Sequence, residues 1–122
     1  MTRAWVVALG AWLAAGCARP PAPAAVAASG GSPARGRQML AGWGCGSCHT
    51  IPGVPGANSA VAPPLTSYAA RAFVAGQAPN TPENLVRWIM HPQSVVPLTA
   101  MPDLGAPEPI ARDMAAYLYT LR

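Results

Sequence analysis

The chain has 122 residues, enough for one domain and too few for a second catalytic module. Hydrophobic residues make up 52% of it and charged residues only 10%, but these averages combine an N-terminal segment with a folded part. From residue 33 onward the chain holds six arginines, four acidic residues and no lysine. This mild positive charge comes without a basic run or a basic–aromatic stripe, so the sequence does not indicate nucleic-acid binding.

The N-terminus is typical of a signal peptide. Arg3 is followed by an uncharged run over residues 4–15 that is rich in Val, Leu and Trp. This run is shorter than the ~20 residues that a permanent membrane-spanning helix needs. We therefore expect residues 1–16 to be an export signal, which predicts a protein of the periplasm or of the outer face of the membrane.

Cys17 follows Leu13-Ala14-Ala15-Gly16, a sequence that resembles the lipoprotein box of bacteria, although Ala14 stands where a leucine is usual. A lone third thiol is unfavourable in an oxidising compartment. We predict that Cys17 is the lipidated first residue of the mature protein; the alternative is an incidental residue removed with the peptide. Residues 17–32 are rich in Ala, Pro and Gly, which predicts a disordered tether at a membrane surface.

Residues 33–122 show helical spacing between proline-rich connections and no alternating run that would favour a sheet. We expect an all-α domain with long loops. Helices are predicted over residues 34–44, 67–75, 82–91 and from 108 toward the C-terminus.

Local signals support these helices. Gly36 lies at a position where a close crossing of two helices would leave no room for a side chain. Tyr68, Ala72 and Phe73 are the predicted buried side of the second helix. Thr81 is a cap residue followed by proline at the first helical position. The last helix has the clearest apolar stripe, formed by Ile110, Met114, Tyr117, Leu118 and Leu121.

The motif that carries chemistry is Cys45-Gly46-Ser47-Cys48-His49. Two thiols three residues apart can reach the two vinyl groups on one edge of a haem, and the adjacent histidine then lies under the iron. The motif predicts one covalent haem c, attached through Cys45 and Cys48, with His49 as the proximal ligand.

Two other interpretations of the cysteine pair are weaker. A thioredoxin-like redox pair needs a strand-to-helix context, which this domain is not expected to offer. A structural zinc site needs further clustered ligands, and the other histidine, His91, stands alone.

With these features, residues 33–122 resemble the monohaem class I cytochromes c. The resemblance rests on Gly36, on the motif, on Ala62-Pro63-Pro64-Leu65, on Met101-Pro102 and on the aromatic-rich last helix. It implies a small fold of four to five helices wrapped around one haem. It also implies that the carbonyl of Pro63, or of the adjacent Pro64, accepts a hydrogen bond from Nδ1–H of His49.

A soft thioether opposite the histidine stabilises reduced haem iron. Met39 and Met114 lie on apolar helix faces and are expected in the core. Met101 lies in a loop where the resembled family carries its ligand methionine, and we predict it as the sixth ligand. Its rival is the adjacent pair Met90-His91, in which His91 would give a bis-histidine haem.

Three aromatic residues are expected near the haem. Tyr68 and Trp88 each combine an apolar ring with one polar hydrogen, which suits a propionate neighbour as well as a core position. Trp43, two residues before the motif, is expected to shield a haem edge or to pack at the helix crossing.

Iron bound by both His49 and Met101 would have no open coordination position. The sequence therefore predicts a single-electron carrier and not an enzyme; the alternative is a five-coordinate haem that acts as a peroxidase or gas sensor. Expected partners are redox proteins, either a haem-copper oxidase, as the resemblance implies, or a periplasmic dehydrogenase. The protein would act as a monomer or as a subunit of a complex.

Overall fold

The computed structural model describes residues 24–122. The predicted signal peptide and Cys17 lie outside the described residues. In the described part, helices are the main secondary structure, with one small antiparallel sheet. In chain order the elements are α1 (Ala24–Ser29), α2 (Pro33–Gly42), the 3₁₀ helices η1 (Cys45–Ser47) and η2 (Tyr68–Ala70), β1 (Phe73–Val74), β2 (Ala78–Pro79), α3 (Pro82–Met90), α4 (Pro92–Val95) and α5 (Glu108–Leu118).

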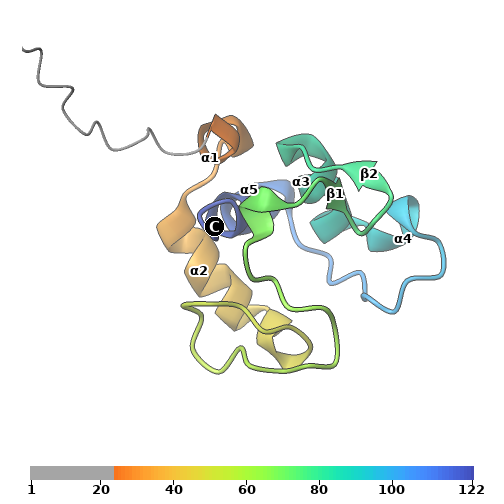
Figure 1. Ribbon diagram of the computed structural model, residues 1–122, viewed down its shortest axis with the longest axis horizontal. Coiled ribbons are helices and arrows are strands. Elements are labelled where there is room, and N and C mark those ends of the chain that lie inside the picture. The colour runs from red at the N-terminus through yellow and green to blue at the C-terminus, as the bar shows by residue number, and fades with distance from the viewer. Residues whose placement is uncertain (1–23) are drawn as a thin grey trace, which may run out of the picture.

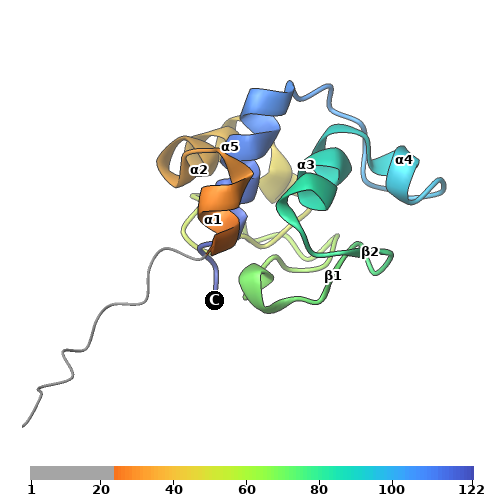
Figure 2. The ribbon, with the colours of Figure 1, turned by 90° about the horizontal axis from the view of Figure 1, so that it is seen from above.

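Helix α5 is the centre of the arrangement (Figures 1 and 2). Helices α1, α2 and α3 all pack against it, with α1 and α2 on one side and α3 on the other in Figure 2. Helix α4 packs on α3 at the outer edge. None of the helices in residues 24–122 has the length and apolar character that a membrane span requires.

Three of the four predicted helices are present as α2, α3 and α5. Helix α3 has the predicted cap, because the Thr81 hydroxyl accepts a hydrogen bond from the Asn84 N–H at 3.3 Å. It ends at Met90, before Pro92 as expected. Pro92 then begins the short helix α4, which the sequence analysis did not predict.

The helix predicted over residues 67–75 is wrong. The chain makes a single 3₁₀ turn and then the short two-stranded hairpin of β1 and β2. Ser67 and Ala75 have φ angles of 50° and 49°, which no right-handed helix contains. Tyr68 is buried as predicted, but Phe73 is 56% exposed.

The prediction of a disordered tether over residues 17–32 is wrong from residue 24 onward. Residues 24–29 form α1, which packs on α5 and α3 and buries Val26 and Ser29. The Arg112 guanidinium also donates a hydrogen bond to the Ser29 carbonyl at 3.0 Å. The prolines of this segment stop at residue 23, and the alanines that follow have the highest helix propensity. The ordered domain therefore includes residues before its predicted start at 33.

The closest approach in the core is the crossing of α2 and α5. A Cβ atom on Gly36 would lie 1.9 Å from the carbonyl oxygen of Asp113. On α5 the most deeply buried positions are Ala111, Ala115 and Ala116, each 0% exposed. Small residues on both helices thus let the two backbones nearly touch, and the role predicted for Gly36 is confirmed.

Asp113 joins the start of α2 to the middle of α5. It is 4% exposed, and its carboxylate accepts hydrogen bonds from the Ser32 N–H at 2.7 Å and from the Arg35 guanidinium at 2.8 and 2.9 Å. The Arg35 hydrogen bonds hold the pKa of Asp113 below its usual range, and the Ser32 N–H contributes. This carboxylate therefore stabilises the fold in its charged form.

Replacing Gly36 with Ala should lower the free energy of unfolding by about 1–3 kcal/mol, because the added methyl must push two backbones apart. Gly42→Ala is the matched control in the same helix, since a Cβ there would meet nothing within 4 Å. Urea unfolding of both variants measures the difference. Equal stabilities of the two variants would contradict the close crossing.

Asp113→Asn should also destabilise the protein, by about 1–3 kcal/mol at pH 7, because the variant loses charge-assisted hydrogen bonds. A carboxyl whose pKa is lowered on folding stabilises the fold above the pKa of the unfolded chain, and this contribution is lost as the pH falls through the folded pKa. The difference in the free energy of unfolding between wild type and Asp113→Asn should therefore be constant from pH 7 to about pH 5 and shrink below about pH 4. Urea unfolding at a series of pH values measures it, and a gap that does not change with pH would count against the Asp113 interaction.

Candidate functional site

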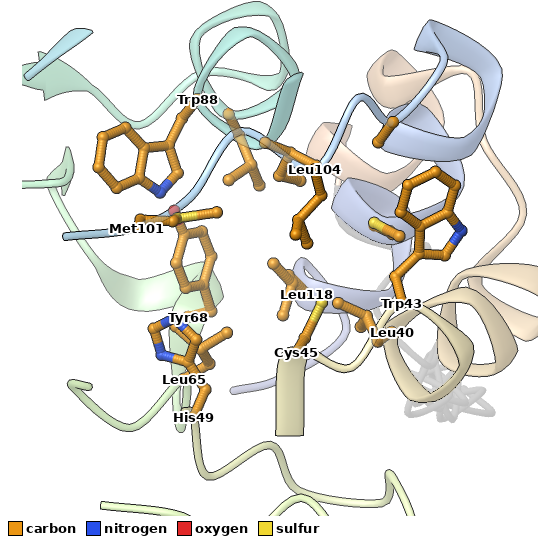
Figure 3. A pocket seen from close by; sticks show the side chains of 14 residues that line it. Leu40, Trp43, Cys45, His49, Leu65, Tyr68, Trp88, Met101, Leu104 and Leu118 are labelled. Atoms are coloured by element: carbon orange, nitrogen blue, oxygen red, sulfur yellow. The ribbon is translucent and has the colours of Figure 1, made fainter. Parts of the chain in front are cut away.

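An apolar pocket lies among α2, α3, α5 and the loops that follow α2 and α4 (Figure 3). Its walls surround about 560 Å³ of space, a figure that includes open solvent at the mouth. Most of its lining is aliphatic, aromatic or sulfur-bearing. The lining residues are Leu40, Trp43, Cys45, His49, Leu65, Tyr68, Leu85, Trp88, Ile89, Met101, Leu104, Ala106, Met114 and Leu118.

The cysteine motif forms a tight turn at the end of α2. Gly44 has a φ of 75°, which turns the chain out of the helix. The His49 N–H then donates to the Cys45 carbonyl at 3.0 Å. This turn brings the side chains of Cys45 and His49 into the pocket, while the half-buried Cys48 lies outside its lining.

Gly46, the first of the two residues between the cysteines, is also fixed by packing. A Cβ atom on Gly46 would lie 2.7 Å from the Cα atom of Ala57. The long loop after the motif therefore lies directly against it, and a side chain at position 46 would force the backbone of this loop to move.

His49 is oriented by the backbone of that loop. Its Nδ1 atom lies 2.7 Å from the carbonyl oxygen of Pro63. Since a carbonyl only accepts, Nδ1 carries the hydrogen and donates it. In the neutral ring, Nε2 is then left with a free lone pair, which is the form that binds a metal.

The contact that the sequence assigned to Pro63 or Pro64 is thus made by Pro63. The Pro64 carbonyl instead accepts a hydrogen bond from the Arg71 guanidinium. Arg71 also lies over the Tyr68 ring, with 5.0 Å between its Cζ atom and the ring centroid. The two adjacent prolines therefore have different roles, one toward the pocket and one toward the outer loop.

Met101 is brought to the same pocket as His49 from a distant part of the chain. In Figure 3 both side chains lie in the left half of the view, Met101 above near Trp88 and His49 below near Leu65. Met114 also lines the pocket, from α5, although the sequence placed it only in the core. Met39 and Met90 pack against the core and are not lining residues.

His91, the rival ligand, lies outside the pocket lining. Its Nδ1 atom is 3.1 Å from a carboxylate oxygen of Asp103, and its side chain is 58% exposed. The structure therefore groups Met101, and not His91, with His49.

The three aromatic residues predicted near a cofactor, Trp43, Tyr68 and Trp88, all line the pocket. Burial raises the pKa of Tyr68 to about 12, so its hydroxyl stays protonated at neutral pH. In Figure 3 the Tyr68 ring extends from the side of His49 toward Met101. Leu104 and Ala106 also line the pocket, and no sequence pattern marks them, because they lie in a loop without a periodic apolar face.

The local structure does not favour the two alternative uses of the cysteines. The motif follows a helix and not a strand, and burial raises the pKa of Cys45, whereas a reactive redox thiol has a lowered pKa. Within residues 24–122, no three His, Cys, Asp or Glu side chains gather in a group that could hold a metal ion. A zinc site made from such side chains thus lacks its ligands in this part of the chain.

Asn80 is a further residue that supports the site. Its amide donates hydrogen bonds to the carbonyls of Tyr68 and Arg71 at 3.2 and 2.9 Å. Its carbonyl accepts one from the hydroxyl of the buried Tyr119 at 2.8 Å. One side chain therefore joins the turn that carries Tyr68 to the C-terminal end of the chain.

Asn80→Ala should lower the free energy of unfolding by about 1–3 kcal/mol, because it leaves buried polar groups without partners. Tyr119→Phe should lower the free energy of unfolding by less. The loss in the double variant should be smaller than the sum of the two single losses, because both substitutions remove the same hydrogen bond. Urea unfolding of the three variants completes the cycle. Strictly additive costs would show that the two side chains do not interact.

Comparison with known proteins gives a partial similarity. The chain is 34% identical over 88 residues to the cytochrome c oxidase subunit 2 of Alkalihalophilus pseudofirmus, an alignment that covers 72% of this chain and 24% of that protein. The chain thus spans about a quarter of the length of this curated relative. No protein-family model matches the chain, and no solved structure does. The similarity fits a respiratory electron-transfer role in general.

Proposed function

We propose that this protein is a single-electron carrier with one covalently bound haem c, which Cys45 and Cys48 would attach and whose iron His49 and Met101 would bind. The observation that carries the proposal is the state of His49. Its Nδ1–H is engaged by Pro63 at 2.7 Å, and its ring lines the same apolar pocket as Met101. Two residues of the cysteine motif, Cys45 and the oriented His49, thus share one cavity with a methionine from a separate loop.

The residues present fit a haem. The lining is mostly apolar, as a porphyrin face requires, and aromatic rings from Trp43, Tyr68 and Trp88 enclose it. Cys45 lies in the lining, and Cys48 follows it by one short turn. When bound, haem supplies a metal that accepts and releases one electron.

The role of the protein residues is to hold two ligands and to exclude water. The Pro63 carbonyl fixes the His49 ring and increases its basicity. The Met101 thioether, a soft neutral ligand, favours the reduced metal. With both positions filled no substrate could bind, so we assign the protein to electron transfer and not to enzymatic catalysis.

The similarity to an oxidase subunit supports a place beside a membrane-bound respiratory complex. We propose a cytochrome c oxidase as the electron acceptor, and an exported protein held near it by lipid at Cys17. Mass spectrometry of protein extracted from membranes tests the anchor. An N-terminus at Cys17 without lipid, or a water-soluble mature protein, would contradict the proposed lipid anchor.

The axial ligand assignment is tested by replacing Met101 with Leu, which keeps the side-chain volume and removes the sulfur. The variant should keep its covalent haem and lose the weak long-wavelength band of sulfur-to-iron ligation. Its reduction potential should fall by on the order of 100 mV, within the wide range that axial ligands set. Optical spectroscopy and a redox titration measure both effects.

Met90→Leu is the matched control, because Met90 lies outside the pocket lining, and its spectrum should equal that of the wild type. An unchanged band in Met101→Leu would show that another residue supplies the sulfur ligand, and Met114 is the next candidate in the pocket. A high-spin spectrum of the oxidised wild type would instead favour a five-coordinate haem with a peroxidase or gas-sensing role.

A further inference from the structure

The loop that carries Met101 lacks the usual backbone support. Between residues 100 and 106 no N–H or carbonyl takes part in a backbone–backbone hydrogen bond within the described residues. The loop is nevertheless attached to its surroundings through side chains. Its conformation therefore depends on a few polar side-chain contacts, and these are concentrated at Met101 and Asp103.

Both backbone polar groups of Met101 are bonded by side chains. The Gln93 amide nitrogen donates to the Met101 carbonyl at 2.9 Å. The Met101 N–H donates to the Thr99 hydroxyl oxygen at 3.2 Å. The shorter of the two bonds comes from another element, α4, and it is therefore the one that fixes Met101 relative to the rest of the domain.

Gln93 belongs to α4, a short helix that burial and backbone hydrogen bonds hold in place. Pro92, its neighbour in α4, is among the most deeply buried residues, and the Val96 N–H donates to the Pro92 carbonyl at 2.9 Å. The preceding residue, His91, donates its N–H to the Arg87 carbonyl of α3 at 2.8 Å. The Gln93 amide is thus presented from a short helix that is closed onto α3.

A second contact attaches the same loop to the same end of α4. Asp103 accepts a hydrogen bond from the Gly105 N–H at 2.8 Å and contacts His91 Nδ1 at 3.1 Å. The loop is therefore held at residue 101 by Gln93 and two residues later by His91. These two contacts together fix the position of residues 101–103, the segment that carries the Met101 side chain.

We propose that Gln93 is a positioning residue for the Met101 ligand: its amide holds the Met101 carbonyl and keeps the thioether in the pocket. The proposal rests on the haem ligation described above. It assigns a role to the short helix α4, which contributes no lining residue and acts on the pocket through one hydrogen bond to the backbone of the Met101 loop. Loss of this bond should let Met101 leave the iron more often.

The test uses the haem-loaded full chain and imidazole, a small ligand that binds ferric haem only when Met101 has left the iron. Gln93→Ala and the near-isosteric Gln93→Glu, which has no amide donor, should each bind imidazole about 3- to 10-fold more tightly than wild type. This range corresponds to the loss of one hydrogen bond that water partly replaces. Thr99→Val, which removes the longer bond, should have a smaller effect in the same direction.

Gln77→Ala is the matched control, because Gln77 is an exposed glutamine in the hairpin turn with no side-chain hydrogen bond in the described residues. It should bind imidazole as the wild type does. The free energy of unfolding is measured for every variant. A merely structural role for Gln93 would lower that free energy in Gln93→Ala while the imidazole affinity stayed at the wild-type value.

Two results would overturn the proposal, and they differ. If the wild type shows the band of sulfur-to-iron ligation and Gln93→Ala binds imidazole with unchanged affinity, the role of Gln93 is wrong and the ligation by Met101 stands. If the wild type lacks that band, the ligation itself is wrong, and the positioning role of Gln93 is rejected with it.

Discussion

The crossing of α2 and α5 is the constraint on which the rest of the structure depends. The two helices approach until the Gly36 position leaves no room for a methyl group beside the Asp113 carbonyl. The cysteine motif begins directly after α2, and Met114 and Leu118 of α5 line the pocket. The closeness of the two helices therefore decides where Cys45 and His49 stand relative to the pocket wall that α5 forms.

Around this fixed pair, the pocket is completed by α3 and by loops that hydrogen bonds hold in place. The Pro63 carbonyl orients His49 from one loop, and Gln93 and Thr99 bond the backbone of Met101 in another. Each candidate ligand thus has a partner outside its own segment. A ligand pair held in this way would change position little when the metal gains or loses an electron, which is what a carrier needs.

Local sequence signals predicted the parts of this structure that depend on local chemistry. The cap at Thr81 and the glycine at position 36 could each be assigned because a residue type had one physical use there, whereas the carbonyl of Pro63 or Pro64 was implied by the family resemblance. The pairing of His49 with Met101 in one pocket came from a family resemblance, and the geometry agrees with that pairing. Haem binding itself, and the class I cytochrome c fold, stay predictions.

The parts that could not be predicted depend on contacts between distant segments. Helix α1 forms from an alanine-rich stretch that composition alone assigned to a tether, because its burial against α5 is not visible in the sequence. The hairpin after Tyr68 replaces a helix because Asn80 bonds to the turn from nine and twelve residues away. The bond from Gln93 to Met101 joins an exposed side chain to a backbone carbonyl, and no residue pattern marks such a contact.

The most direct test of the central claim is the mass of one peptide. The chain is expressed in a host that attaches haem c and is digested with trypsin, which cleaves after arginine; the peptide that spans residues 38–71 then contains the whole cysteine motif. We predict that this peptide carries the mass of one haem, bonded through Cys45 and Cys48. A peptide with two free thiols, or with a disulfide between them, would contradict the proposal that this protein is a cytochrome.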